Sequence, residues 1–247
     1  MPYFNLTDSL NLISKFTIRR TWNAYKVWLS YQLSKIAGKP IQWGYPISIS
    51  FEPTTSCNLR CPECPSGLRE FTRPTGMLQK SFFEQTIDDI HKELLYLIFY
   101  FQGEPYLNPD FLNMVKYAHD KGIYTATSTN AHYLTDEKAK ATVESGLDRL
   151  IISIDGTTQD VYQSYRVGGK LEKVLENWKL AGIPSSYILQ SMTANAAELL
   201  GLEKTRGVLE KSYYADIIAV KNNPLDNIDA IKSVRFVMKE GKVIRRD

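Results

Sequence analysis

The sequence predicts an α/β fold in which parallel strands alternate with helices. Apolar segments of strand length recur between residues 46 and 154, and segments with helical spacing separate them. Strand, helix and strand in this order imply parallel pairing. Sites of parallel α/β folds lie beyond the carboxyl ends of the strands. Each polar motif in this chain falls at such an end.

The composition of the whole chain is ordinary for a globular protein. Of its 247 residues 43% are apolar and 23% charged, and the net charge of +3 does not favour a nucleic-acid partner. Arg19 and Arg20 are expected to be solvated surface residues. The longest apolar run, Leu94–Phe101, is too short for a transmembrane segment. The N-terminus lacks the pattern of a signal peptide, so we expect a cytoplasmic protein.

Residues 1–45 form a predicted N-terminal helical extension. Apolar and aromatic side chains recur at helical spacing over residues 8–37, and a helix is expected to begin near Asp8. This helix either packs over a larger domain, which we favour, or lies on a membrane surface. The pattern changes after Gly38.

Four strand–helix units follow. The predicted strands cover Ile47–Phe51, Leu95–Phe101, Ile123–Ser128 and Arg149–Ile154. The predicted helices cover Lys80–His91, Pro109–Asp120, Leu134–Ser145 and the region to about Leu180. Gly146 is a plausible C-cap of the third helix.

The loop after the first strand holds all three cysteines of the chain, Cys57, Cys61 and Cys64. Thiolates in a C-x-x-x-C-x-x-C pattern are suited to an iron–sulfur cluster or to zinc. Three cysteines leave the fourth iron of a [4Fe-4S] cluster open, and an open metal position is typical of a catalytic site. The alternative is a zinc site completed by one of the three histidines, His91, His119 or His132.

Residues 46–182 resemble a radical S-adenosylmethionine enzyme of the branch that often carries a SPASM domain. The cysteine loop after the first strand carries the resemblance. It implies a partial (β/α) barrel with one [4Fe-4S] cluster, whose open iron binds S-adenosylmethionine. Reductive cleavage then gives a 5′-deoxyadenosyl radical that abstracts a hydrogen atom. The resemblance further implies an electron donor such as flavodoxin or ferredoxin and, in this branch, a peptide or protein substrate.

A second motif of that family, Gly103-Glu104-Pro105, follows the second strand. Glycine permits a close approach of the backbone to a ligand, and a carboxylate can accept hydrogen bonds from an ammonium group. The resemblance therefore assigns Glu104 to the amino group of S-adenosylmethionine, with Gly103 and Pro105 shaping the turn.

The ends of the third and fourth strands supply further candidates for cofactor contacts. By resemblance these are Ser128 and Asn130, then Ser153 and Asp155, and finally Arg166. The alternative is that the polar residues cap helices or turns and that Arg166 is an exposed helix residue. Two positions depart from the family: Glu63 stands where an aromatic residue is usual, and Ala131 stands where many relatives have glycine.

Residues 187–247 differ in character from the rest of the chain. The segment from Met192 to Ile244 resembles the C-terminus of a metal-dependent amidohydrolase of the imidazolonepropionase and prolidase-like kind. It predicts one helix, a strand at Ala215–Val220 and a hairpin at Val234–Ile244. No histidine follows His132, so hydrolase chemistry is not expected.

The sequence therefore predicts three parts: the extension at 1–45, a truncated radical S-adenosylmethionine core at 46–182 and a small α+β tail at 187–247. Only four of the six β/α units usual in the family are counted, and the tail has no cysteines for a SPASM domain. We expect a fusion or a misjoined reading frame near residues 182–186; the alternative is an authentic two-part protein. The favoured function is radical enzymology; the alternative is an inactive iron–sulfur or zinc-binding chimera.

Overall fold

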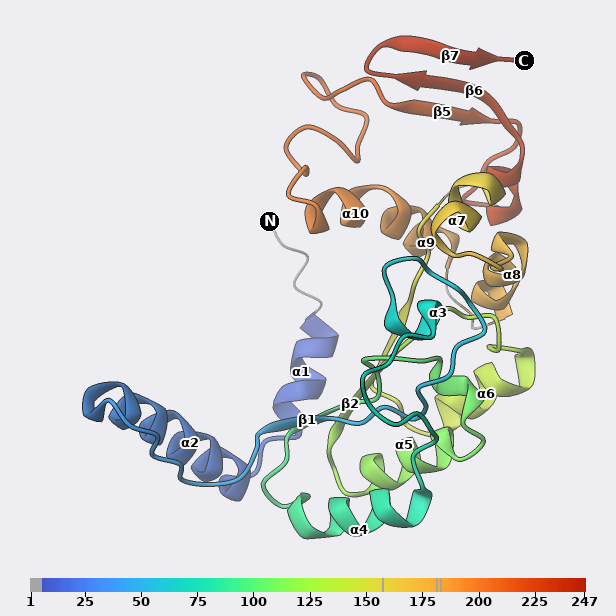
Figure 1. Cartoon of the computed structure of the whole chain (residues 1–247). Helices are drawn as coiled ribbons and strands as arrows, with labels where there is room; N and C mark the ends of the chain where they lie inside the picture. Colours follow the sequence, from blue (N-terminus) through green and yellow to red (C-terminus); the bar gives the residue numbers. More distant parts are fainter. Residues whose placement is uncertain (1–5, 157, 181, 183) are drawn as a thin grey trace. The chain divides into compact units, whose positions relative to one another are not determined.

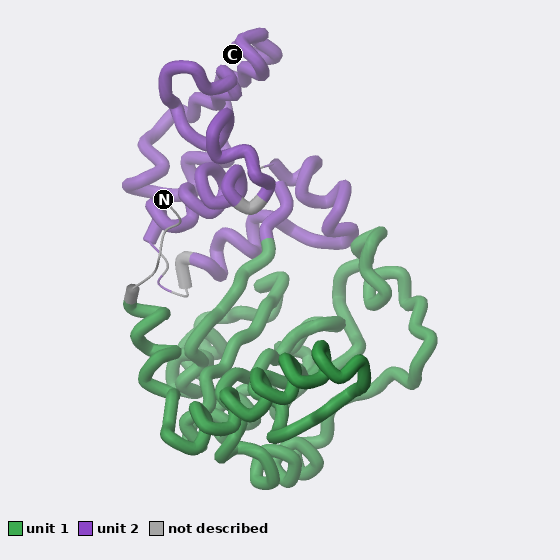
Figure 2. Tube along the Cα trace, turned by 90° about the vertical axis from the view of Figure 1, so that its left-hand side faces the viewer, with its two compact units in different colours: residues 1–153 green, residues 154–247 purple. Residues whose placement is uncertain are grey.

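The computed structural model of the chain describes residues 6–156, 158–180, 182 and 184–247 (Figure 1). Within it the chain forms two compact units, residues 1–153 and 154–247, which Figure 2 shows in green and purple. The predicted parts 1–45, 46–182 and 187–247 were divided by sequence pattern, which is a different criterion from compactness. Their boundaries therefore stay a prediction.

The first unit is built on a four-stranded parallel sheet. Its strands pair in the order β1-β2-β3-β4. They are β1 Ser48–Ser50, β2 Tyr96–Ile98, β3 Tyr124–Thr129 and β4 Arg149–Ile152. The helices between them are α3 Pro65–Leu68, α4 Lys80–Ile90, η1 Pro105–Leu107, α5 Phe111–Asp120 and α6 Asp136–Glu144. The predicted α/β class and its four parallel strands are confirmed.

Aromatic side chains join the helices to the central strands. The ring of Phe99, directly after β2, lies 5.5 Å from that of Phe83 in α4 and 5.6 Å from that of Phe111 in α5. All three side chains are fully buried. Burial of such large apolar surfaces is the main stabilising contribution between these helices and the sheet.

The N-terminal extension contains two helices rather than the predicted one. They are α1 Leu6–Ser14 and α2 Ile18–Ala37. The break falls at residues 15–17, where Thr17 adopts an extended backbone and its hydroxyl accepts a hydrogen bond from the N–H of Arg20. A threonine in this position is a helix N-cap, and its preference for capping outweighs the continuous helical spacing.

Arg20 is buried, so its prediction as a solvated residue is wrong. Its guanidinium donates to the carbonyl oxygens of His91 at 2.9 Å and of Gly122 at 2.5 Å. These carbonyls follow the C-terminal ends of α4 and α5, where unpaired carbonyl groups attract a cation. Arg19, by contrast, has a largely exposed side chain and pairs with Glu93.

The second unit contains four helices and a small antiparallel sheet among its described residues. The helices are α7 Gln159–Tyr165, α8 Leu171–Leu180, α9 Ser185–Met192 and α10 Ala194–Leu199. The strands pair as β5-β6-β7, with β5 Ile217–Val220, β6 Val234–Lys239 and β7 Lys242–Arg246, and η2 Ile228–Lys232 precedes β6. The predicted strand and hairpin of the tail are present.

No helix of the described residues is both long and apolar enough to cross a bilayer.

Candidate functional site

The cysteine loop leaves the carboxyl end of β1 and is tied down on both sides. Its start pairs with the segment before α4, where the N–H of Thr55 donates to the carbonyl of Gly76 at 3.1 Å. Leu59, in its middle, is buried in the core. Its end caps α3, and a Cβ on Gly67 in that helix would lie 2.5 Å from the backbone N of Cys61. The loop therefore has a fixed backbone against which the thiols are placed.

The three cysteines are thiols and not disulfide partners. Cys61 is buried, and Cys57 and Cys64 are half-buried. Burial raises the pKa of the Cys57 thiol, and the charges of Glu104 and of the other two cysteines add to this effect. A bound metal cation would instead lower the pKa of this thiol, because cysteine binds metals as the anionic thiolate.

The donor set of the cysteine loop is compatible with a multi-iron cluster. Among the described residues, no three His, Cys, Asp or Glu side chains converge on a point that could hold one metal ion. A four-iron cluster takes a separate thiolate for each iron, so it accepts ligands that are spread along a loop. The donor set, three soft thiols on one short loop, fits that group.

The three histidines proposed for the zinc alternative make the following contacts. His91 faces the carbonyls of Ile87 and Asp88 at the end of α4. The ring of His119 lies against Gly146, where an added Cβ would approach it to 2.5 Å. His132 is buried and lies close to Asn130.

The Gly103-Glu104-Pro105 turn packs directly on the cysteine loop. Gly103 has a positive φ of 79°, and a Cβ there would lie 1.9 Å from the carbonyl oxygen of Thr54. The N–H of Gly103 donates to the Ser66 hydroxyl oxygen at 2.9 Å, and the N–H of Glu104 donates to the carbonyl of Ser56 at 2.8 Å. Only glycine permits both this backbone conformation and this close approach.

Glu104 connects the turn to the end of β3. Its carboxylate accepts a hydrogen bond from the Thr129 hydroxyl at 2.6 Å and one from the backbone N–H of Asn130 at 2.9 Å. The residue is 1% exposed, and burial raises its pKa above the ordinary value despite these bonds. Pro105 then begins η1.

Asn130 links Glu104 to the cysteine loop. Its side-chain amide donates to the Asn58 carbonyl oxygen at 2.8 Å and lies 3.8 Å from the Cys57 sulfur. Ala131, next in the chain, has a positive φ of 61°. That conformation favours glycine, which gives a physical reason for the glycine expected at this position.

Ser128 and Ser153 lie side by side at the ends of β3 and β4, with their hydroxyl oxygens 3.4 Å apart. Asp155 and Arg166, in the second unit, form an ion pair with each other. The structure thus brings the cysteine loop, the Gly103–Pro105 turn and Asn130 into one contact network within the first unit.

Several residues of this network were missed in the sequence. Asn58 pairs with Asn130, while Gln102 accepts a hydrogen bond from Ser66 at 3.1 Å and lies 3.5 Å from the Cys64 sulfur. Each directly neighbours a motif residue in the chain. Their position next to a motif residue was the only local signal in the sequence. Their hydrogen bonds join separate loops, so they can be recognised only once the fold is known.

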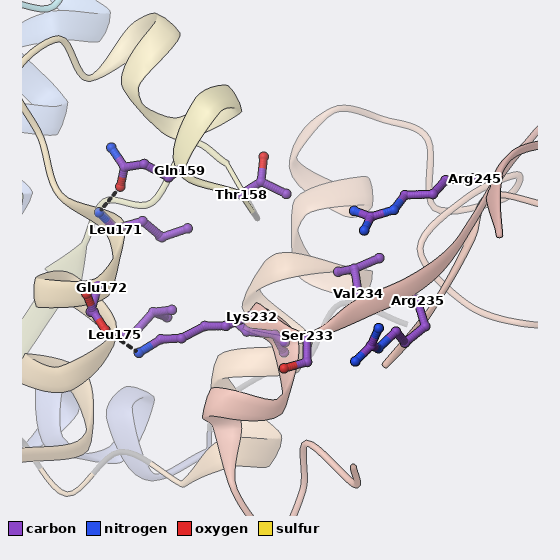
Figure 3. Close-up of a pocket in the computed structure, with 11 residues that line it drawn as sticks. Thr158, Gln159, Leu171, Glu172, Leu175, Lys232, Ser233, Val234, Arg235 and Arg245 are labelled. Atoms are coloured by element: carbon purple, nitrogen blue, oxygen red, sulfur yellow. Dashed lines mark hydrogen bonds and ion pairs between the residues drawn. The ribbon is translucent and has the colours of Figure 1, made fainter. Parts of the chain in front are cut away.

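A further pocket lies within the second unit (Figure 3). Its lining is polar and apolar in similar measure, with basic groups from η2 and the small sheet; Lys232 of η2 pairs with Glu172 of α8 at 3.3 Å. None of the predicted site residues lines it. Its principal charged residues are Glu172, Lys232, Arg235 and Arg245.

The model of the Radical SAM superfamily matches residues 51–189. This is more than half of the chain, and the chain belongs to that superfamily. The match includes the cysteine loop, the Gly103–Pro105 turn and the polar residues after β3 and β4.

Curated relatives are similar over the same region. The AdoMet-dependent heme synthase of Methanosarcina barkeri (strain Fusaro / DSM 804) is 30% identical over 53% of this chain and 37% of its own length. The mycofactocin maturase MftC of Mycobacterium tuberculosis (strain ATCC 25618 / H37Rv) is 30% identical over 62% and 40%. The PqqA peptide cyclase of Rhodopseudomonas palustris (strain ATCC BAA-98 / CGA009) is 28% identical over 51% and 33%. The chain thus spans about two fifths or less of these relatives.

Among solved structures, anSMEcpe with bound AdoMet has a TM-score of 0.47 at 21% identity, covering 56% of this chain and 41% of that one. SuiB of Streptococcus suis has a TM-score of 0.46 at 18% identity, covering 55% and 30%.

Proposed function

We propose that this chain binds one [4Fe-4S] cluster through Cys57, Cys61 and Cys64 and binds S-adenosylmethionine beside it. The observation that carries the proposal is the Asn130 link, which joins the cysteine loop to the buried Glu104. Two motifs far apart in the sequence thereby share one network at the carboxyl ends of β1, β2 and β3. Membership of the superfamily implies the same two cofactors.

When bound, the cluster supplies the electron that reductively cleaves S-adenosylmethionine to a 5′-deoxyadenosyl radical. The protein's own part is to position the two cofactors and to exclude water from the site. Gly103 and Pro105 shape the turn, and Glu104 provides negative charge for the ammonium group of the cofactor. Ser128, Asn130 and Ser153 offer hydroxyl and amide groups, and Asp155 and Arg166 remain proposed cofactor contacts by resemblance to the family.

The proposed substrate class is a peptide or a protein. The names of two relatives, a mycofactocin maturase and a PqqA peptide cyclase, favour this class. We propose a cytoplasmic setting and a flavodoxin or ferredoxin as electron donor. Residues 187–247, which resemble an amidohydrolase C-terminus in sequence, are proposed to take no part in the chemistry. The inactive metal-binding chimera is not favoured, because the family match includes both motifs.

The direct test is cofactor cleavage. The anaerobically reconstituted chain, incubated with S-adenosylmethionine and dithionite, is expected to form 5′-deoxyadenosine and methionine in equal amounts. The Cys61→Ala variant serves as the control and is expected to form neither above the background. Absence of both products from cluster-loaded parent protein would contradict the proposed function.

A further inference from the structure

The helix α2 turns its aromatic side outward. Trp22, Tyr25 and Trp28 are exposed, and their rings form a continuous band: the centroids lie 5.5 Å apart for Trp22 and Tyr25 and 6.0 Å apart for Tyr25 and Trp28. Ile18 and Ile36, at the two ends of the same side, are 93% and 84% exposed. An exposed apolar surface of this extent is unusual for a helix in water and marks an interaction surface.

The opposite side of α2 is polar, and it is the side that is covered. Asn23 is buried and pairs twice with the backbone of Tyr45, and Ser34 pairs with the backbone of Ile41. The returning segment 39–45 therefore lies against the polar face. Together with the buried Arg20, these contacts fix the rotation of the helix and leave its apolar face without a partner among the described residues.

In α1, too, polar residues face the rest of the unit while apolar residues are exposed. Asn11 donates to Asp148 at 2.8 Å, and Lys15 pairs with Asp148 at 3.1 Å, so polar groups attach this segment to the unit. Leu10 and Ile13 are exposed. Phe16, Ile18, Trp22 and Tyr25 line one shallow groove at the junction of α1 and α2. The apolar surface is thus continuous across the junction.

Basic residues flank the apolar face of α2. With about 3.6 residues per turn, Arg19 and Lys26 fall on one flank of the line through Ile18, Trp22 and Ile36, and Lys35 falls on the other. Lys35 is exposed and lies 5.6 Å from the centre of the Tyr31 ring. The segment 6–45 holds six basic residues and one acidic residue, Asp8.

We propose that α2 lies in the plane of an anionic phospholipid surface, with its Trp22 face in the lipid interface. Tryptophan and tyrosine prefer this interface, and lysines on both flanks reach the phosphate groups while their stems cover lipid. A helix with an apolar aromatic face and basic flanks has the character of an interfacial helix. The charge complementarity favours lipid over another protein surface. The proposal does not depend on the reaction proposed above.

The test is co-sedimentation of the full chain with vesicles. Vesicles of phosphatidylcholine with about 30% phosphatidylglycerol should bind the parent protein, and pure phosphatidylcholine vesicles should bind it more weakly. Trp22→Glu/Ile36→Glu should lower the partition at least tenfold. Lys26→Gln/Lys35→Gln should lower it by about fivefold per lysine at low ionic strength, because each basic residue contributes roughly this factor at an anionic surface.

Phe82→Glu/Val143→Glu is the matched control. It places the same two charges on exposed apolar residues of α4 and α6 in the same unit, and it should bind vesicles like the parent. Equal partition of the two glutamate variants, or no binding of the parent to anionic vesicles, would overturn the proposal. It would also be overturned by a dimer that forms without vesicles and that Trp22→Glu/Ile36→Glu abolishes, since that result assigns the face to a second copy.

Discussion

Glu104 accepts hydrogen bonds from Thr129 and from the backbone of Asn130 while almost none of its surface reaches solvent. A carboxylate in this position has two consequences. It holds the end of β3 against the turn after β2, and it concentrates negative charge at the site proposed for an ammonium group. The two consequences can be separated by experiment.

Glu104→Ala should reduce the free energy of unfolding by about 1–3 kcal/mol, because it leaves buried donors without an acceptor. It should also weaken S-adenosylmethionine binding by about ten- to a hundredfold while the cluster is retained, since a charge-assisted bond is lost. Urea unfolding and titration of cluster-loaded protein measure the two effects. Equal cofactor affinity of variant and parent would remove Glu104 from the proposed site.

Gly103→Ala should destabilise the chain by more than a positive φ alone explains, because its Cβ would meet the carbonyl oxygen of Thr54. Gly38→Ala is the control, since Gly38 has a φ of 64° but nothing within 4 Å of an added Cβ. We expect about 1–2 kcal/mol for Gly38→Ala, the cost of the left-handed conformation, and a larger loss for Gly103→Ala in urea unfolding. Equal losses would show that the turn does not need this close approach.

The motifs of the site were predictable from the sequence, because their residue types and spacing are specific. The contacts that join them were not. Neither the bond from Asn130 to Asn58 nor the burial of Glu104 against Thr129 leaves a local signal, since both depend on which strands are neighbours. The roles assigned to the individual residues remain predictions.

At the scale of single elements, α2 shows how a local pattern misleads. Its apolar spacing predicts burial of the apolar side, yet the polar side is covered by the returning chain. The break before Ile18 follows from the Thr17 cap, which local spacing alone does not reveal. The strands of the sheet, by contrast, were predicted correctly because β-branched and aromatic residues cluster between turn signals.

Arg20 joins α2 to the ends of α4 and α5, and its removal should be costly. Arg20→Met keeps much of the apolar stem but leaves buried carbonyl groups unpaired, so we expect a loss of about 1–3 kcal/mol in the free energy of unfolding. Arg19→Met should cost less than about 1 kcal/mol, because the Arg19 side chain is largely exposed and an exposed ion pair contributes little. Similar losses for both variants in urea unfolding would contradict the capping role of Arg20.

At the scale of the whole molecule, the chain is divided twice in different ways. Compactness separates residues 1–153 from 154–247, whereas the sequence patterns predict a junction near residues 182–186. The fold class was predictable because four strand–helix units repeat with clear turns. The boundary between the two compact units was not predictable, because it depends on how α7 and α8 pack with the small sheet.

Residues 187–247 are expected to be less firmly folded than residues 46–182, because a helix pair and three short strands bury little apolar surface. Limited digestion with a protease of broad specificity should therefore cut first near residues 182–186, which contain no lysine or arginine, or within 204–212, where Lys204 and Lys211 are exposed. The remaining N-terminal fragment should keep the cluster. Resistance at these positions, with unfolding of the chain in a single transition, would show that the tail is an integrated part of the fold.

Metal analysis after anaerobic reconstitution shows whether Cys57, Cys61 and Cys64 hold one four-iron cluster. We expect about four iron and four sulfide per chain, oxygen-sensitive absorption, and loss of the cluster in the Cys61→Ala variant. Stoichiometric zinc without iron, or a cluster unaffected by Cys61→Ala, would contradict this expectation.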